Sequence, residues 1–535
     1  MRSKLTVIAF MMGLLLGISQ TSNCTVYSQS GVPEERIEKV VALLVQFTDQ
    51  TATTSVGEIQ TRLARLDAYW REVSYEMIRV SVVTYGWYNL SQPMSYYGQN
   101  PHGERRNQTR YFELIRESVS LAKQDVDFSA HSMLMIAHSG NGEELSQRNE
   151  DLWSWSFWEW TNITSVGKTL IRGAAIVPES QPEPYDPFGT YVHEFGHLVG
   201  SYYGDKMGLP DLYDYEGKET FVGEWSPMAD GAQLGNGCWP AGLDAYCRIK
   251  LGFIQPVKIS ASPEYVTVSI NAIELYRSAL SLPINKTHYY LVEMRQKIGF
   301  DRFLPDEGVI VYLVDGTKSS GHGIVKVVLG GMKVEEVFEA PTKDLYFKII
   351  SKHEESVTLA VSSRMASVRV EHPFQWIMPV IEIEVTDQNN EPIPGINTRV
   401  SVGNRQYSGM TDENGIVQLE LDIFLVGKCE VTIICTNAVA KTGRFEIILW
   451  GPTILYLLVL LVLFVLFLLS RRHRSTERSY TQLCDQFAPC IGLIFVPYDL
   501  GKLTPYYSPY RYAQQNPQSR PDRRRNRGIG LHMLN

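Results

Sequence analysis

The sequence lacks several patterns that define familiar classes of protein. None of its seven cysteines belongs to a CxxC pair, so a zinc ribbon held by four thiolates is excluded. GxSxG, P-loop and GxGxxG patterns are also absent, which removes the signatures of serine esterases and of nucleotide- and dinucleotide-binding sites. EF-hand spacing does not occur either. A functional site of this chain is therefore expected in other groupings of histidine and carboxylate side chains.

The composition is that of a globular protein rather than a disordered one. The 535 residues are 44% hydrophobic and 20% charged, and a chain of this length has room for two or three domains. Charge is unevenly divided, because residues 471–535 hold 11 Lys and Arg against 4 Asp and Glu, whereas the whole chain has a formal charge of −8. The first 470 residues are therefore strongly acidic.

Two apolar runs near the ends of the chain predict its location. Arg2 and Lys4 precede an apolar stretch that is too short to span a bilayer, which is typical of a signal peptide, placed at residues 1–25. Residues 447–469 carry no charge over 23 positions and are soon followed by "RRHR", which predicts one transmembrane helix and a cytoplasmic tail at residues 470–535. The expected location is the cell membrane, as a single-pass type I protein with its larger part extracytoplasmic.

The basic tail has no hydrophobic periodicity and is expected to be disordered. Its charge is explained by attraction to the anionic lipids of an inner membrane leaflet. No nucleic acid is expected as a partner, even though residues 523–527 read "RRRNR". The sequence names no cytoplasmic partner for the tail.

Three folded units are predicted between the two ends. Residues 35–255 alternate between strand and helix patterns, which predicts an α+β (α/β) domain. Residues 256–365 show mainly strand patterns and predict a β-rich domain packed on the first. Residues 379–445 contain strands separated by Asn, Gly and Pro turns, which predicts a small β-sandwich. The turns "TDENG" and "NEPIPG" resemble those of carboxypeptidase-regulatory-like and immunoglobulin-like modules, so this unit is expected to be a stalk.

Residues 193–197 read "HEFGH", which is the HExxH pattern of zinc sites. On a helix, residues i and i+4 lie on one face, so His193 and His197 can bind one Zn²⁺ ion while Glu194 acts as the general base. The later stretch "WSPMADG" has the form of a Met-turn, in which Met228 packs beneath the site as a structural residue. A catalytic zinc ion takes a third protein ligand, which the pentad does not supply.

Several stretches, in the same order along the chain, resemble the immune inhibitor A-like family of zinc metallopeptidases, a metzincin-like group. They include "YWREVSYEMIRVSVVTYGWYNL", "HEFGH", "GLPDLYD", "VGEWSPMADG", "CWPAGLDAYCRIKLGF" and "YYLVEMRQKIGFDRFLPDEGVIVYLVD", within about residues 35–320. The resemblance implies a zincin-like catalytic domain, zinc as the cofactor, and Asp211 of "GLPD" as the third ligand. A structural Ca²⁺ ion is a further expectation, without an assigned position.

The third ligand lies further along the chain than in the uninterrupted family pattern. Eight additional residues separate His197 from Asp211, and Asp205 lies inside this insertion as an alternative ligand. A thermolysin-like arrangement would use Glu216, Glu219 or Glu224 instead, although the order of the motifs favours Asp211. Tyr213 could donate a hydrogen bond to an oxyanion, or it could only pack.

These features predict a membrane-anchored, outward-facing zinc endopeptidase. Water activated by the metal and by Glu194 would hydrolyse a peptide bond of a protein or peptide substrate without a covalent intermediate. The alternative is a catalytically inactive surface protein for adhesion or binding that keeps the peptidase scaffold. The presence of Glu194 beside both histidines favours the enzyme.

Overall fold

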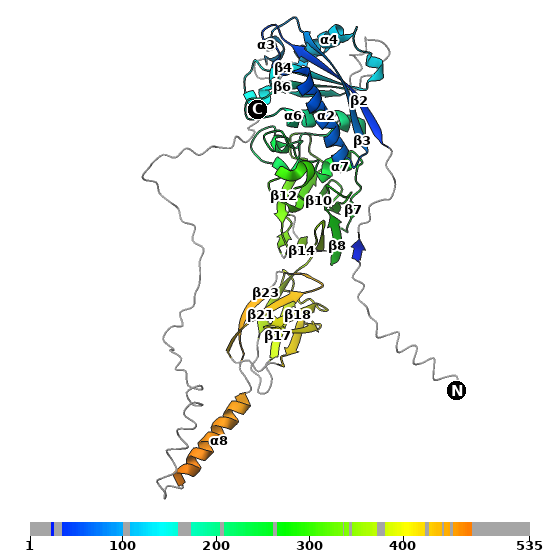
Figure 1. Cartoon of the computed structure of the whole chain (residues 1–535). Coiled ribbons are helices and arrows are strands. Elements are labelled where there is room, and N and C mark those ends of the chain that lie inside the picture. Colours follow the sequence, from blue (N-terminus) through cyan, green and yellow to red (C-terminus); the bar gives the residue numbers. More distant parts are fainter. Residues whose placement is uncertain are drawn as a thin grey trace, which may run out of the picture.

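The structure is a computed structural model of the whole chain (Figure 1). It describes residues 23–25, 35–99, 108–158, 173–203, 208–260, 265–334, 336–341, 345–371, 380–422, 427–440, 443–449 and 453–472. Most of the predicted signal peptide and most of the predicted cytoplasmic tail lie outside the described residues, as does Asp205.

The first sheet has the strand order β3-β2-β4-β6-β5. Its four parallel strands are β2 (Arg36–Gln46), β3 (Ile78–Asn89), β4 (Met133–Asn141) and β6 (Gly173–Ser180), and β5 (Trp155–Trp158) runs antiparallel to β6 at one edge. The apolar runs of β2, β4 and β6 are buried on both faces, as is usual for parallel strands in the centre of a sheet.

Helices cover both faces of this sheet (Figure 1). One core is formed by α2 (Val56–Val73) and α6 (Phe188–Tyr203), and the other by α3 (Met94–Gly98) and α4 (Gln108–Ala122). Successive residues of β2 enter these two cores in turn, because side chains of a strand alternate between its faces. The helix that carries "HEFGH" is therefore held between the sheet and the rest of its core.

Two further five-stranded sheets follow, with the orders β12-β11-β10-β9-β7 and β1-β8-β15-β14-β13. They share one core, and the first of them also contributes Leu291, Ile310 and Tyr312 to the core around α6. The second unit is thus packed firmly against the first. The strands are β1 (Asn23–Thr25), β7 (Val257–Lys258), β8 (Val266–Asn271), β9 (Leu280–Pro283), β10 (His288–Arg295), β11 (Gly308–Asp315), β12 (Val325–Met332), β13 (Val337–Glu339), β14 (Tyr346–Lys352) and β15 (Ser356–Ser362).

A third unit contains two four-stranded sheets around a separate core, with the orders β20-β17-β16-β22 and β19-β18-β21-β23. It touches the second unit where Lys348 donates a hydrogen bond to the carbonyl of Ala440. The strands are β16 (Met365–Glu371), β17 (Val380–Thr386), β18 (Asn397–Val402), β19 (Arg405–Met410), β20 (Ile416–Glu420), β21 (Gly427–Cys435), β22 (Val439–Ala440) and β23 (Gly443–Leu449).

Short helices complete the described part of the chain. They are η1 (Phe128–Ala130), α5 (Glu143–Ser146), η2 (Gly223–Trp225), η3 (Asp230–Gln233), α7 (Ala245–Lys250) and η4 (Gly299–Phe303), and the longer α8 (Thr453–Arg472) follows the third unit.

The predicted fold class is wrong. We expected an α+β (α/β) chain with a zincin-like catalytic domain, a β-rich domain, a small β-sandwich and one transmembrane helix. In the described residues strands outnumber helices, and the chain is built from five sheets. The helices that pack on a sheet are confined to the first unit and its connection to the second, because the later strands bury their alternating apolar residues against other strands.

The predicted transmembrane helix at residues 447–469 is also wrong. Among the helices of the described residues, none combines the length and the apolar character needed to cross a membrane. The apolar run is divided between two elements, because its first residues end β23, where Ile447 pairs with Cys429 of β21, and α8 begins only at Thr453. The single-pass type I anchor derived from this run is therefore not retained.

Candidate metal centre

The two histidines of "HEFGH" project from the same side of α6. The helix begins just after Asp186, whose carboxylate accepts a hydrogen bond from the backbone N–H of Phe188 at 2.8 Å. Phe195 of the pentad is buried in the core, so His193 and His197, at i and i+4, lie on a different side, with their ring centroids 4.9 Å apart. The helical spacing expected from the sequence thus brings the rings together.

Backbone carbonyl groups fix how both imidazole rings are protonated. His193 Nδ1 lies 2.9 Å from the carbonyl oxygen of Pro227, and His197 Nδ1 lies 2.6 Å from that of Leu209. A carbonyl oxygen can only accept a hydrogen bond, so each Nδ1 carries the hydrogen and each neutral ring keeps its lone pair on Nε2. The two Nε2 atoms lie 3.2 Å apart and face each other.

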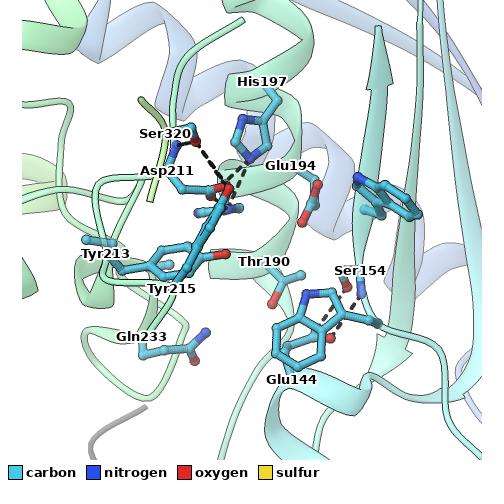
Figure 2. A pocket seen from close by; sticks show the side chains of 15 residues that line it. Glu144, Ser154, Thr190, Glu194, His197, Asp211, Tyr213, Tyr215, Gln233 and Ser320 are labelled. Carbon is cyan, nitrogen blue, oxygen red and sulfur yellow. Dashed lines mark hydrogen bonds and ion pairs between the residues drawn. The ribbon is translucent and has the colours of Figure 1, made fainter. Parts of the chain in front are cut away.

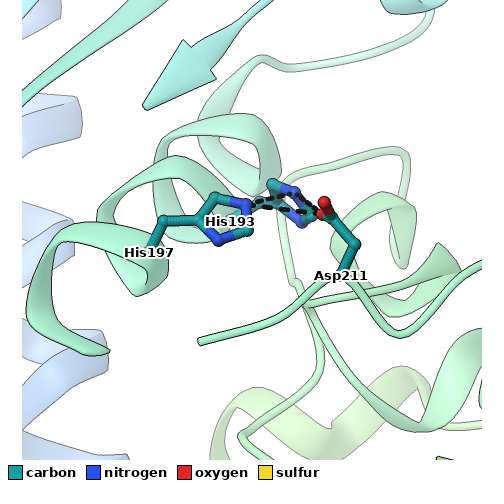
Figure 3. Close-up of side chains that lie close together, drawn as sticks. All are labelled: His193, His197 and Asp211. Atoms are coloured by element: carbon teal, nitrogen blue, oxygen red, sulfur yellow. Dashed lines mark hydrogen bonds and ion pairs between the residues drawn. The ribbon is translucent and has the colours of Figure 1, made fainter. Parts of the chain in front are cut away.

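Asp211 joins the two rings with one carboxylate oxygen (Figure 3). Asp211 Oδ1 lies 3.1 Å from His193 Nε2 and 3.4 Å from His197 Nε2. It is buried, and its close neighbours are these two Nε2 atoms. Three atoms with lone pairs therefore converge, and they attract a positive charge between them.

The spacing of these three atoms fits a zinc ion. Zinc binds nitrogen and oxygen ligands at about 2.0–2.1 Å with tetrahedral angles, which places neighbouring ligand atoms about 3.3 Å from one another. The three observed separations of 3.1, 3.2 and 3.4 Å surround this value. Two imidazoles and one carboxylate also form a donor set that zinc accepts in catalytic sites, where a fourth position stays open.

The pKa values of the site show the same attraction for positive charge. Burial by itself lowers the pKa of His193, but the hydrogen bond and charge of Asp211 and the charge of Glu194 outweigh it and raise this pKa to about 9. Burial raises the pKa of Asp211, but the two histidines outweigh it and hold this pKa well below its usual range. The negative charge around the two imidazoles thus favours the binding of either a proton or a metal cation.

Close backbone packing returns the chain to the site after the insertion. A Cβ atom at Gly200 of α6 would lie 2.0 Å from the backbone nitrogen of Leu209, and one at Gly208 would lie 2.8 Å from the carbonyl oxygen of His197. Gly208 has a φ of +75°, a conformation that glycine adopts without strain. Leu212 then donates its backbone N–H to the carbonyl of Met228 at 2.8 Å. Segment 208–212 is therefore seated on α6.

Glu194 lines the same cavity as the metal-ligand cluster (Figure 2). The cavity has a volume of about 260 Å³, and the exposed fraction of Glu194 is 5%. Ser156 of β5 donates its hydroxyl at 2.8 Å to Glu194 Oε2 and lies 2.7 Å from the Glu194 carbonyl. One carboxylate oxygen is thus held by the edge strand of the first sheet.

Met228 and Tyr213 lie next to the metal-ligand cluster. Met228 is fully buried, and a Cβ atom at Gly196 would lie 2.8 Å from its sulfur, so its side chain packs directly under α6. Tyr213 lines the cavity, with its ring centroid 6.2 Å from that of His193. Both of its expected roles, oxyanion donor and packing, agree with this position.

The three glutamates of the thermolysin-like alternative do not join the cluster. Among the described residues, the group that could hold a metal contains His193, His197 and Asp211. Glu216 pairs with a lysine two residues away, Glu219 pairs with a lysine of β12, and Glu224 is exposed on η2. Asp205 lies outside the described residues, so that alternative ligand is not placed.

Sequence reasoning missed three residues that contact the proposed base or ligand. Ser156 contacts Glu194, and both Tyr215 and Ser320 contact Asp211. Tyr215 follows the "GLPDLYD" motif directly, so its nearness to Asp211 could have drawn attention to it. Ser156 and Ser320 are 38 and 109 residues from their partners, and no local pattern marks them.

Comparisons with known proteins identify no family for this chain. No family model matches the chain, and no curated protein is significantly similar to it. One similar solved structure is the extracellular domain of a hybrid two-component system from B. thetaiotaomicron, which is 8% identical with a TM-score of 0.14. The match covers 33% of this chain and 26% of that chain. A likeness this weak carries no argument about fold or function, so membership of the immune inhibitor A-like family remains a prediction.

Proposed function

We propose that the protein is a zinc-dependent endopeptidase related to the immune inhibitor A-like family, with His193, His197 and Asp211 as metal ligands and Glu194 as general base. One observation carries this proposal. Three lone-pair atoms converge at the spacing of zinc ligands in a cavity that also holds a buried glutamate. A protein that used this helix only as a scaffold would have no need to keep all four side chains in this arrangement.

The residues of the cavity have separate tasks in this reaction. A zinc ion held there would supply Lewis acidity toward a substrate carbonyl and would lower the pKa of water. Oε1 of Glu194 accepts a proton from the attacking water, because Oε2 already accepts a hydrogen bond from Ser156. Glu194 later gives this proton to the leaving amine. Trp155 and Tyr213 form aromatic walls that orient a peptide and limit access of bulk water.

We also propose that the protein acts outside the cytoplasm on protein or peptide substrates. The apolar stretch behind Arg2 and Lys4 supports export, as do glycosylation sequons at Asn89, Asn107, Asn162 and Asn285. This part of the proposal does not depend on a membrane anchor.

Cleavage of a denatured protein by the zinc-loaded full-length chain tests the proposed function. Glu194→Gln removes the base but keeps the size of the side chain, so we expect zinc binding to stay and cleavage to fall by about 10²–10⁴-fold. Glu391→Gln, an exposed change in the third unit, is the matched control and should cleave like the wild type. Equal cleavage by the wild type and Glu194→Gln would refute the base. A wild type that binds zinc but cleaves nothing would favour the inactive surface-binding alternative.

A further inference from the structure

The two carboxylate oxygens of Asp211 have different environments. Oδ1 faces the two imidazoles, whereas Oδ2 accepts a hydrogen bond from the hydroxyl of Tyr215. Ser320 Oγ lies 3.5 Å from the same Oδ2, and it also accepts a hydrogen bond of 2.9 Å from the backbone N–H of Asp211. The two hydroxyl groups lie 3.2 Å from one another, so they form one cluster behind the ligand (Figure 2).

Ser320 comes from a distant part of the chain, the loop of residues 316–324 between β11 and β12. The next residue of this loop, Gly321, forms backbone hydrogen bonds with both Asp211 and Tyr215. Its N–H donates to the carbonyl of Asp211 at 3.0 Å, and its carbonyl accepts from the N–H of Tyr215 at 3.0 Å. The second unit is therefore bonded to the backbone that presents the third ligand.

Gly321 also gives the Tyr215 ring its place. It has a φ of +71°, and a Cβ atom there would lie 2.3 Å from ring atoms of Tyr215. The Tyr215 ring thus lies directly against the loop backbone. The ring of His322, the next residue of the loop, also lies close to it, with the two ring centroids 5.5 Å apart. This contact fixes the direction of the Tyr215 hydroxyl toward Asp211.

We propose that Tyr215 and Ser320 are positioning residues of the metal centre, and that the loop of residues 316–324 is a working part of it. By holding Oδ2, the two hydroxyls prevent rotation of the carboxylate and keep Oδ1 directed at the two Nε2 atoms. This device compensates for the insertion after His197, because Asp211 is not tied to α6 by a short helical spacing. The inference rests on the proposed metal centre.

Zinc affinity of the full-length chain, measured by competition with a chromophoric chelator, tests this inference without reference to cleavage. Partners behind metal ligands typically change metal affinity by about 10–100-fold, so Tyr215→Phe and Ser320→Ala should each weaken binding by an amount in this range. Neither change removes bulk from the core. Ser319→Ala, an exposed change in the same loop, is the matched control and should bind zinc like the wild type.

Metal-free stability separates positioning from a merely structural role. If the two residues position the ligand, the urea midpoint of the metal-free variants should stay close to that of the wild type while zinc affinity falls. A double variant with wild-type affinity would overturn the inference and leave the zinc peptidase intact. A fall in metal-free stability that accounts for the whole loss of affinity would also overturn it. Failure of the proposed function itself is distinguishable, because the wild type would then bind no zinc, or would bind zinc without cleaving the denatured protein.

Discussion

His138 provides a pH-dependent test of the packing in the first unit. It lies in the buried part of β4, is itself fully buried, and its ring is tilted against that of Phe47 with the ring centroids 5.9 Å apart. Its Nδ1 lies 2.9 Å from the carbonyl of Ser139, and its Nε2 has no hydrogen-bond partner in the described part of the chain. Burial lowers the pKa of this imidazole from 6.5 to about 4, more than the Ser139 carbonyl and Glu179 raise it.

The magnitude follows from linkage between protonation and folding. Between pH 6.5 and pH 4 the unfolded chain binds a proton at this histidine and the folded chain does not. The stabilisation is therefore complete above pH 6.5 and is lost as the pH falls toward 4. At about 1.4 kcal/mol per pKa unit, the full effect is about 3 kcal/mol, of which about 2 kcal/mol is lost between about pH 7 and pH 5.

Urea unfolding followed by tryptophan fluorescence, with a chelator present to remove metal, measures this effect at pH 7 and pH 5. His138→Phe removes the titrating group, so its free energy of unfolding should fall by about 2 kcal/mol less over this interval than that of the wild type. His353→Ala, an exposed change, should keep the wild-type dependence. The same dependence in the wild type and His138→Phe would refute the reasoning.

Three further changes test other parts of the account. Gly200→Ala places a methyl group against the backbone of Leu209, and it should lower stability by about 1–3 kcal/mol and weaken zinc binding, measured by unfolding and by chelator competition. Arg295→Met leaves three buried carboxylates without their counter-charge and should lower the free energy of unfolding by about 3–5 kcal/mol. Ser156→Ala frees the carboxylate of Glu194 and should reduce the rate of peptide cleavage by roughly tenfold or more at unchanged zinc content.

The changes at Gly200 and Arg295 each have a control at a comparable position. Gly57→Ala has open space around the new methyl group, so it should cause no loss of stability. The ion pairs that Arg369 makes with other described residues are exposed, so Arg369→Met should lower the free energy of unfolding by less than about 1 kcal/mol. Equal losses at Arg295 and Arg369 would contradict the importance assigned to the buried network. Full cleavage by Ser156→Ala would show that Glu194 needs no support from β5.

The part of the site that depends on local geometry could be predicted from the sequence. His193, Glu194 and His197 lie within five residues, and helical spacing alone brings the two rings together. Asp211 required more, because its approach to the rings depends on the close contacts of Gly200 and Gly208 rather than on spacing. The resemblance pointed to it where residue patterns alone left other carboxylates open.

The residues behind the ligands could not be predicted, because their contacts join distant segments. Ser320 reaches Asp211 only after β11 has packed its face against the core around α6. The prediction of the fold class was wrong for a related reason. A strand pattern in the sequence does not show whether the strand packs against a helix or against another sheet. In the apolar run at residues 447–469, hydrophobicity gave no sign that Ile447 would pair with Cys429 as part of β23.

The zinc content of the full-length chain tests the central claim most directly. After equilibration with zinc and removal of excess metal, atomic emission should find about one zinc ion per wild-type chain, and clearly less in His193→Ala and Asp211→Asn, as expected for a site with three protein ligands. A wild type without bound zinc, or variants that keep as much zinc as the wild type, would contradict the metal centre.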